Sequence, residues 1–351
     1  MDRRDFLKST GVATTAAALT VTPRASAEAW HTPQPAEHPE IELKGVLEWS
    51  PRARRLDDAV DGFVQTIHAA SGGRISVTLE HASPSSSTRP VTGDIQFRIP
   101  DSRGNDGAFG AILSGLPTAQ PVQPSAHLAW LIGGGGMMMV DRLAAAHDRR
   151  VFAIGRLAAV ASRVTVAPHT AQSLGVSTTT ASGLLADAMS ASGDQIDTQP
   201  ATRLLDVAAE DAGPAAIAGL HPSDLVTSRP DARIVTSELG VSHPGAVVTA
   251  VMSTERWADL SYGQQALLET AATAALARDA AVTEAFLRAM WPSIAKSRVS
   301  AGPAATEISR SRLRAAAADT IADRARKDRE FSMLLNGYLA FCQSGDMMPA
   351  V

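Results

Sequence analysis

Cysteine is almost absent from this 351-residue sequence, and the single Cys342 excludes an internal disulfide, a four-cysteine zinc site and an iron–sulfur cluster. Aromatic residues make up only 4% of the chain, so the cores must be built mainly from alanine, valine, leucine and isoleucine. No apolar run reaches about 18 residues, whereas a helix that spans a bilayer needs about 20. Basic residues are scattered and the formal net charge is −4, which argues against a nucleic-acid partner.

The remaining composition is typical of a soluble globular protein. Hydrophobic residues make up 45% of the chain and charged residues 19%, which excludes wholesale disorder. At about 150 residues per domain, the length predicts two domains or one large bilobal one.

Residues 1–27 have the order of a secretory signal. Arg3 and Arg4 precede an apolar stretch over 11–21, and Ala25-Ser26-Ala27 supplies a small-residue cleavage pattern. Paired arginines indicate the twin-arginine translocation (Tat) route, which places the mature protein in the periplasm. The alternative is an amphipathic N-terminal helix, but threonine and glycine interrupt the stretch and it has no second apolar face.

A βαβ unit is predicted next, after a flexible, proline- and histidine-containing leader over residues 28–44. Residues 45–50 form a short strand candidate. From Asp57 onward, apolar residues recur at helical spacing until Gly72-Gly73, and residues 75–79 then alternate as a strand does. Such a unit implies a parallel sheet and an α/β fold.

Further elements follow from periodicity and from glycine and proline positions. Strands are predicted at 95–99, over 150–167 with a break around Gly155, and at 214–218, 233–237 and 246–252. Helices are predicted at 125–132, 137–147, 183–192, 200–209, 307–326 and 328–342. The glycine run 133–136 lacks the lysine of a phosphate-binding loop, so a corner between two helices is the better interpretation.

A long alanine-rich helix is predicted over residues 261–297. Ser261 and Gln264 form a capping box at its start, and Pro292 introduces a kink near its end. At 1.5 Å per residue the run reaches roughly 55 Å. Patterns of this length often belong to repeats, coiled coils or dimer interfaces.

Catalytic motifs are not found in the sequence. No GxSxG elbow, HExxH pair or convincing carboxylate pair occurs, so nothing argues for an enzyme. Arg156 and Arg163 interrupt an apolar strand segment, where an unpaired charge would be costly to bury. Either arginine could bind a carboxylate through two hydrogen bonds, and the alternative is a strand arginine that faces solvent.

Four stretches in order carry a resemblance to a known family. They read FVQTIHAASGGRISVTLEHA (63–82), HLAWLIGGGGMMMVDRLAAAH (127–147), ERWADLSYGQQALLETAA (255–272) and LRAAAADTIADRARKDREFSMLLNGYLAF (313–341). Behind an export signal, this order resembles the periplasmic solute-binding proteins of TRAP transporters, the DctP-like family.

The resemblance implies a two-lobed, periplasmic-binding-protein-like α/β fold with mixed and parallel sheets, hinge strands and a long C-terminal helical region. Lobe 1 would begin with residues 45–155, lobe 2 would span 156–248, and 249–351 would supply a returning strand, the long helix and closing helices. Such a protein binds a small organic acid between its lobes and delivers it to a membrane permease. It is a binder without catalytic residues, cofactor or metal, and one branch of the family forms homodimers through a helix like 261–297.

The chain departs from the family at the usual pocket positions. The family's strand arginine falls on or near Thr179, and its pocket glutamine falls near Val160. Its aromatic shelf falls on Ala215, and its glutamate position is His243. The resemblance therefore transfers no ligand contact directly.

The substitute ligand-binding residues that we expect are Arg156, the hydroxyls of Thr178, Thr179 and Thr180, and His243 as a pH-sensitive donor. Two alternatives stay open. The first is a divergent scaffold with another ligand or a protein-interaction role, and the second is a Tat-exported enzyme on a similar scaffold.

Overall fold

A computed structural model describes most of the chain after the signal sequence. The described residues are 38–51, 53–82, 93–101, 106–118, 124–168, 176, 178–209, 214–226, 232–289, 291–302 and 305–346. All of them belong to one compact unit, Ala36–Val351. The predicted signal over 1–27 and most of the predicted leader lie outside the described residues.

The first sheet has five strands in the order β2-β1-β3-β10-β4. Their bounds are Ile41–Leu47 for β1, Ile75–His81 for β2, Ile95–Arg98 for β3, Arg149–Arg156 for β4 and Val247–Ser253 for β10. β1 pairs in parallel with β2 and β3, whereas β10 runs antiparallel to β3 and β4. The predicted parallel βαβ unit is therefore confirmed.

The strand predicted at 45–50 begins earlier than expected. β1 starts at Ile41, where the backbone N–H donates to the Arg74 carbonyl over 3.1 Å and the residue is in register with Ile75. Leu43 is buried in the core. Residues 41–44 therefore belong to the sheet rather than to a flexible leader, because their apolar side chains alternate in the same way as those of β2.

The second sheet has six strands in the order β11-β9-β5-β8-β6-β7. Their bounds are Val160–Pro168 for β5, Thr179–Ala181 for β6, Ile196–Thr198 for β7, Ala215–Ala218 for β8, Ala232–His243 for β9 and Val299–Ala301 for β11. Both parallel and antiparallel pairs occur, as the expected mixed fold requires.

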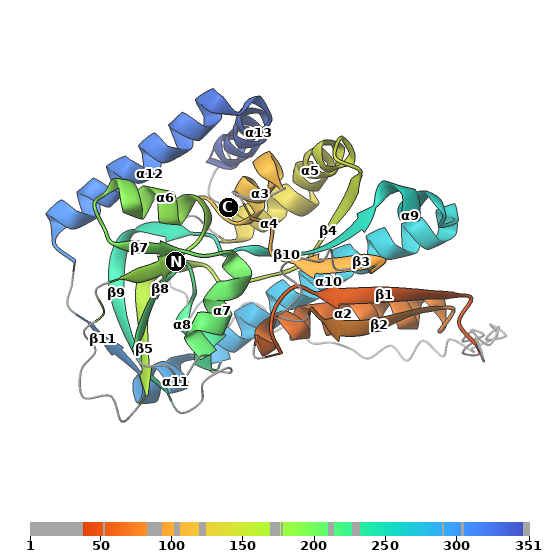
Figure 1. Ribbon diagram of the computed structural model, residues 1–351, viewed down its shortest axis with the longest axis horizontal. Helices are drawn as coiled ribbons and strands as arrows, with labels where there is room; N and C mark the ends of the chain where they lie inside the picture. Colours follow the sequence, from red (N-terminus) through yellow and green to blue (C-terminus); the bar gives the residue numbers. More distant parts are fainter. Residues whose placement is uncertain are drawn as a thin grey trace, which may run out of the picture. The chain divides into compact units, whose positions relative to one another are not determined.

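Helices cover both faces of the first sheet (Figure 1). One face packs against α2 (Arg54–Ser71) and α10 (Tyr262–Ala289). The other face packs against α3 (Gly107–Leu113), α4 (Pro124–Ile132), α5 (Gly136–Ala145) and α13 (Arg329–Asp346). Successive side chains of β4 alternate between these two cores, as expected for a strand buried on both faces.

Helices also cover the second sheet. α7 (Ala201–Ala209) and α8 (Pro222–Val226) contribute to the core on one face, and α6 (Gly183–Ala191) and α12 (Glu307–Lys327) to the core on the other. The short helix α9 (Thr254–Ala258) follows β10. No helix in the described ranges combines the length and the apolar character needed to cross a bilayer.

Two chain segments pass directly between the sheets. β4 of the first sheet continues into β5 of the second, and β9 of the second sheet continues into β10 of the first. We call the two links, residues 157–159 and 244–246, the crossover. The break predicted around Gly155 falls two residues later, because pairing with β10 continues as far as Arg156.

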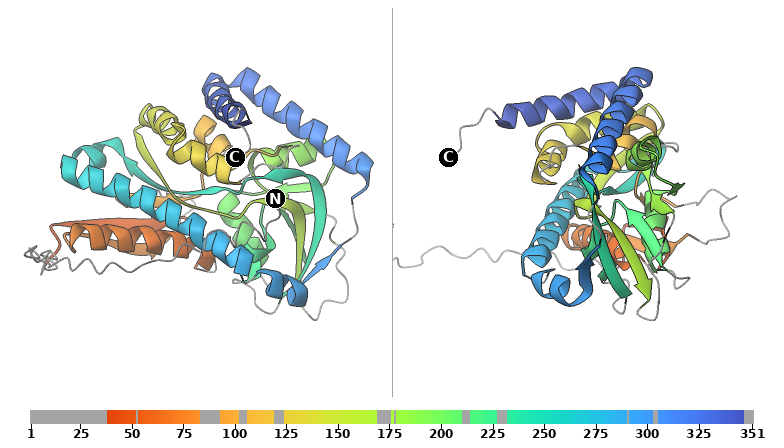
Figure 2. Two further views of the ribbon diagram at one scale, coloured as in Figure 1. Left: turned by 180° about the vertical axis from the view of Figure 1, so that it is seen from behind. Right: turned by 90° about the vertical axis from the view of Figure 1, so that its left-hand side faces the viewer.

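The helix predicted over 261–297 is observed on both sides of residue 290, which lies outside the described residues. α10 is described as far as Ala289, and α11 (Trp291–Arg298) contacts the second sheet (Figure 2). Pro292, where the sequence predicts a kink, lies near the start of α11. The predicted capping box is confirmed, because Ser261 and Gln264 exchange backbone–side-chain hydrogen bonds.

Candidate functional site

The crossover brings two backbone segments into close contact. The Leu157 N–H donates to the Ala246 carbonyl over 2.8 Å. Gly245 adopts a φ of 86°, and a Cβ atom at this position would lie 2.1 Å from the Leu157 oxygen. Only glycine satisfies both the left-handed backbone and this approach.

A buried ion pair holds the end of β4 at the crossover. Asp279 of α10 accepts from Arg55 Nη1 over 2.8 Å and from the Arg156 backbone N–H over 2.9 Å. Arg55 Nη2 donates to the Arg156 carbonyl over 3.0 Å and to Thr283 Oγ1 over 2.8 Å. The side chains of Arg55 and Asp279 are only 15% and 8% exposed, so solvent screens this pair weakly.

A second carboxylate, Asp224 of α8, binds the other side of the crossover. It is 2% exposed and accepts hydrogen bonds from the backbone N–H groups of His221 and Ala158. Burial raises the pKa of Asp224 from 3.8 to about 6, while the charge of Arg55 and the two backbone bonds oppose this rise. The two carboxylates thus bind the chain at Arg156 and at Ala158, on either side of Leu157.

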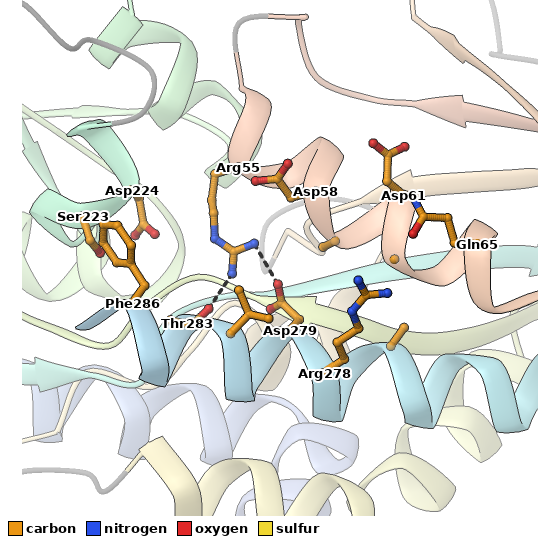
Figure 3. Close-up of a pocket in the computed structure, with 14 residues that line it drawn as sticks. Arg55, Asp58, Asp61, Gln65, Ser223, Asp224, Arg278, Asp279, Thr283 and Phe286 are labelled. Carbon is orange, nitrogen blue, oxygen red and sulfur yellow. Dashed lines mark hydrogen bonds and ion pairs between the residues drawn. The ribbon is translucent and has the colours of Figure 1, made fainter. Parts of the chain in front are cut away.

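A cavity of about 380 Å³ lies beside these groups, between α2, α8 and α10 (Figure 3). Arg55 lies between Asp224 and Asp58 in the close-up and points toward Asp279 and Thr283. The exposed rim carries Asp58, Asp61 and Arg278. Because Asp279 already neutralises Arg55, the lining has an excess of carboxylates and does not favour an anionic ligand.

The predicted threonines lie on the second sheet, away from this cavity lining. Thr179 and Thr180 are buried in β6, and Thr178 is half-buried just before it. Arg163 of β5 reaches across β8 and donates to Thr179 Oγ1 over 3.4 Å. The alanines of β8 that lie opposite them in register, Ala216 and Ala218, leave room for this long side chain.

Arg163 has no carboxylate within 4.0 Å among the described residues, unlike Arg55. It is half-buried, so its charge is partly shielded from water. Arg156 and Arg163 both stand out in the sequence because each interrupts an apolar strand segment. The structure places Arg163 beside one of the predicted threonines, Thr179.

His243 is buried at the end of β9 and is bonded to backbone. Its Nδ1 accepts from the Gly245 N–H over 3.2 Å, and the Ser114 backbone also bonds to the ring. Burial lowers the pKa of His243 from 6.5 to about 4, so the ring is neutral at pH 7. These backbone contacts hold the ring at the crossover, and contact of His243 with a solute stays a prediction.

His127 of α4 lies close enough to Arg156, at the end of β4, and to His243 for their charges to interact with its own. Burial lowers the pKa of His127 to about 4, with smaller contributions from the charges of Arg156 and His243. Burial also lowers the pKa of Arg156, while Asp279 and Glu284 act to raise it. The predicted residues thus fall into two groups, one at the crossover and one around β6.

Arg55, Asp224 and Asp279 were not singled out from the sequence. The sequence does contain one indication of Asp279, because this carboxylate falls on the apolar, buried face of α10, near alanines and Thr283. A charged side chain on such a face needs a partner. No group of three or more histidine, cysteine or acidic side chains able to hold a metal occurs within the described residues.

Comparisons with known proteins bear on the fold and on export. The signal-sequence family of the twin-arginine translocation pathway matches residues 1–20, which confirms the predicted Tat signal. No curated protein matches the chain. A TRAP periplasmic solute-binding protein from Pseudoalteromonas atlantica, solved with bound sodium and pyruvate, matches with a TM-score of 0.64. The two are 14% identical, and the match covers 87% of this chain and 94% of the other.

The fold is that of the TRAP periplasmic solute-binding proteins. A second example, from Bordetella bronchiseptica and solved with calcium and picolinate, has a TM-score of 0.67 at 14% identity, covering 88% of this chain and 94% of the other. A solute receptor from Bordetella pertussis that binds pyroglutamic acid has a TM-score of 0.61 at 13% identity, covering 85% and 99%. The expected two-lobed TRAP solute-binding fold is confirmed, and with the Tat signal it supports a periplasmic protein.

Proposed function

We propose that this protein is an extracytoplasmic solute receptor of a TRAP-type transport system that binds a small organic acid between its two lobes. The observation that supports this most is the TRAP solute-binding fold, shared over most of the chain with receptors solved with pyruvate, picolinate and pyroglutamic acid. In this proposal the lobes are built from residues 45–155 and 156–248, and 249–351 packs against both. The protein is a binder and not an enzyme.

The solute carboxylate binds Arg163 in this proposal. A guanidinium donates two parallel hydrogen bonds to a carboxylate, and partial burial strengthens them. Arg163 lies beside Thr179 and is not neutralised by a described carboxylate, whereas Arg55 is paired with Asp279. Thr179 supplies a hydroxyl on the same face of the sheet as Arg163, whereas Thr180, the next residue of β6, faces the other side. Contacts of the solute with Thr178, Thr180, Arg156 and His243 stay predictions.

An Arg163→Gln variant tests this assignment. We expect at least about a tenfold loss of affinity for the tightest acid among pyruvate, picolinate and pyroglutamate, because hydrogen bonds to a charged group are lost. Titration calorimetry on the mature chain, residues 28–351, measures it after unfolding and refolding to remove any copurified ligand. The matched control is Arg142→Gln, an exposed arginine on α5. Equal affinities for the two variants would refute the role of Arg163.

The partners beyond the solute are the membrane subunits of a TRAP permease, which receive the ligand, and a second copy of the chain. The homodimer would form through the predicted 261–297 helix, whose outer face on α10 carries exposed small residues and Val282. Light scattering of the mature chain measures this oligomeric state.

A further inference from the structure

The cavity between α2, α8 and α10 is separate from the residues assigned to the acid solute. Its described lining includes neither Arg163 nor the threonines around β6, and neither Arg156 nor His243. Its volume of about 380 Å³ falls within the range of roughly 300–1,000 Å³ that is usual for pockets with small organic ligands. The cavity is therefore large enough to hold a ligand of its own.

Carboxylates outnumber arginines in this lining, which carries two more negative than positive charges when every group is ionised. Burial raises the pKa of Asp58, and the neighbouring charges of Asp61 and Asp279 raise it further. Arg55 acts in the opposite direction. This charge favours a cation as the ligand. The charged side chains of the lining are Asp58, Asp61, Asp224, Asp279, Arg55 and Arg278.

The end of the cavity near α8 has one carboxylate in excess (Figure 3). Asp279 and Asp224 share one arginine there, because Arg55 is paired with Asp279 over 2.8 Å and its charge also lowers the pKa of Asp224 against the effect of burial. The Asp224 side chain lines the cavity although the residue is only 2% exposed. The Phe286 ring lies beside it in the close-up, and an aromatic face also attracts a cation.

The opposite end of the cavity has a second carboxylate in excess. Asp58 and Asp61 lie one turn apart on α2, and the arginine on this part of the lining is Arg278 of α10. None of these three side chains has an ion pair within 4.0 Å among the residues that the structure describes. The rim carboxylates are therefore available to a ligand.

Small and apolar residues make up much of the remaining wall, namely Ala59, Gly62, Ala275 and Val282. Such a surface favours methylene groups, because burying them removes apolar area from water. Gly62 adds to the open space, since nothing lies within 4 Å of a Cβ atom built there. The lining thus suits an aliphatic chain with a positive charge at each end.

We propose that this cavity binds an aliphatic diamine, with one ammonium group beside Asp224 and the other beside Asp58 and Asp61. Primary amines resemble the lysine side chain, whose pKa is about 10.4, so both ends of such a ligand are charged at neutral pH. The site goes beyond the proposed receptor function, because it shares no residue with the site of the acid and takes a ligand of opposite charge.

The test measures binding of putrescine and cadaverine to the mature chain, residues 28–351, by titration calorimetry at pH 8 with no acid present. At this pH the Asp224 carboxyl, with a pKa of about 6, is ionised. We expect the tighter diamine to bind at least about tenfold more tightly than butylamine, because the single amine lacks one charged hydrogen-bonded end. Butanediol and Mg²⁺ separate charge at two ends from polarity alone and from divalent charge alone, and neither should compete.

Gly62→Leu is the variant that tests the cavity itself, because it fills the open space without changing the charge. Leucine is also a better helix former than glycine, so α2 should be kept. We expect Gly62→Leu to weaken diamine binding about tenfold or more. Asp58→Asn combined with Asp61→Asn should weaken it several-fold, because both rim charges are lost. The matched control is Asp319→Asn, an exposed aspartate on α12 outside the cavity, which should bind as the wild type does.

The proposal is overturned if neither diamine binds, if butylamine or Mg²⁺ binds as tightly, or if the cavity variants match Asp319→Asn in affinity. Thermal unfolding without ligand checks that each variant is folded. Because the assay contains no acid, failure to bind a diamine leaves the solute proposal standing, and a chain that binds a diamine but no acid would contradict the receptor function alone.

Discussion

Two buried histidines, one half-buried histidine and one buried aspartate are expected to set the response of this protein to acid. Burial lowers the pKa values of His127, His221 and His243 from 6.5 to about 4. Each histidine is neutral in the folded state but takes up a proton in the unfolded state between these pH values. The free energy of unfolding therefore falls on acidification from pH 6.5 to pH 4, by on the order of 3 kcal/mol per histidine.

Asp224 acts in the opposite direction. Its pKa is raised to about 6, so its contribution to stability is present below about pH 4 and is lost as the pH rises through 6. An Asp224→Asn variant lacks this carboxyl, which partly offsets the effect of the histidines. Its free energy of unfolding should therefore fall more steeply than that of the wild type on acidification from pH 6.5 to pH 4. Urea unfolding at a series of pH values measures the slopes, and parallel slopes for variant and wild type would contradict the assignment.

At the residue scale, the sequence could indicate which side chains are unusual in their setting, but not which residues they contact. Arg156 and Arg163 stood out because charges rarely interrupt apolar strands, and Arg163 proved to lie beside Thr179. The bond between Arg156 and Asp279 joins residues 123 positions apart, and no local pattern connects them. His243 shows the same limit, because its burial and its backbone bonds depend on a segment near Ser114.

At the element scale, local pattern predicted the long helices well. The buried stripe of α2, including Val60, Phe63 and Ile67, is helical in spacing, and Gly72 ends the helix with a φ of 62°. The strands β6, β7 and β11 have three residues each and were missed, because alternation over three residues carries almost no signal.

The link between β9 and β10 gives a test at the same scale. Gly245→Ala should destabilise the fold by several kcal/mol, roughly 3 kcal/mol or more, because the backbone is left-handed and the new Cβ meets the Leu157 oxygen. The control Gly263→Ala is in the first turn of α10 with nothing near its Cβ, and should be neutral or stabilising by up to about 1 kcal/mol. Denaturant unfolding of both variants measures the difference, and equal stabilities would show that the crossover is not tightly packed.

At the scale of the whole molecule, the exchange of strands between sheets could not be read from periodicity. The strand patterns predicted an α/β fold with one parallel βαβ unit. Only the resemblance to TRAP solute-binding proteins implied two lobes joined by hinge strands. The structure supplies the physical basis: β4 with β10 and β5 with β9 form antiparallel pairs that continue across both sheets. That continuity makes a lobe rotation possible without unpairing either sheet.

The most direct test of the receptor account is a thermal unfolding comparison of the refolded mature chain with acids and their neutral amides. Pyruvate, picolinate and pyroglutamate are each paired with the amide of the same skeleton. A ligand at 100 times its dissociation constant stabilises the folded state by about 2.7 kcal/mol, which raises the melting temperature by a few degrees or less. The account predicts a rise with at least one acid and none with its amide, whereas no rise with any acid, or equal rises with acid and amide, would contradict it.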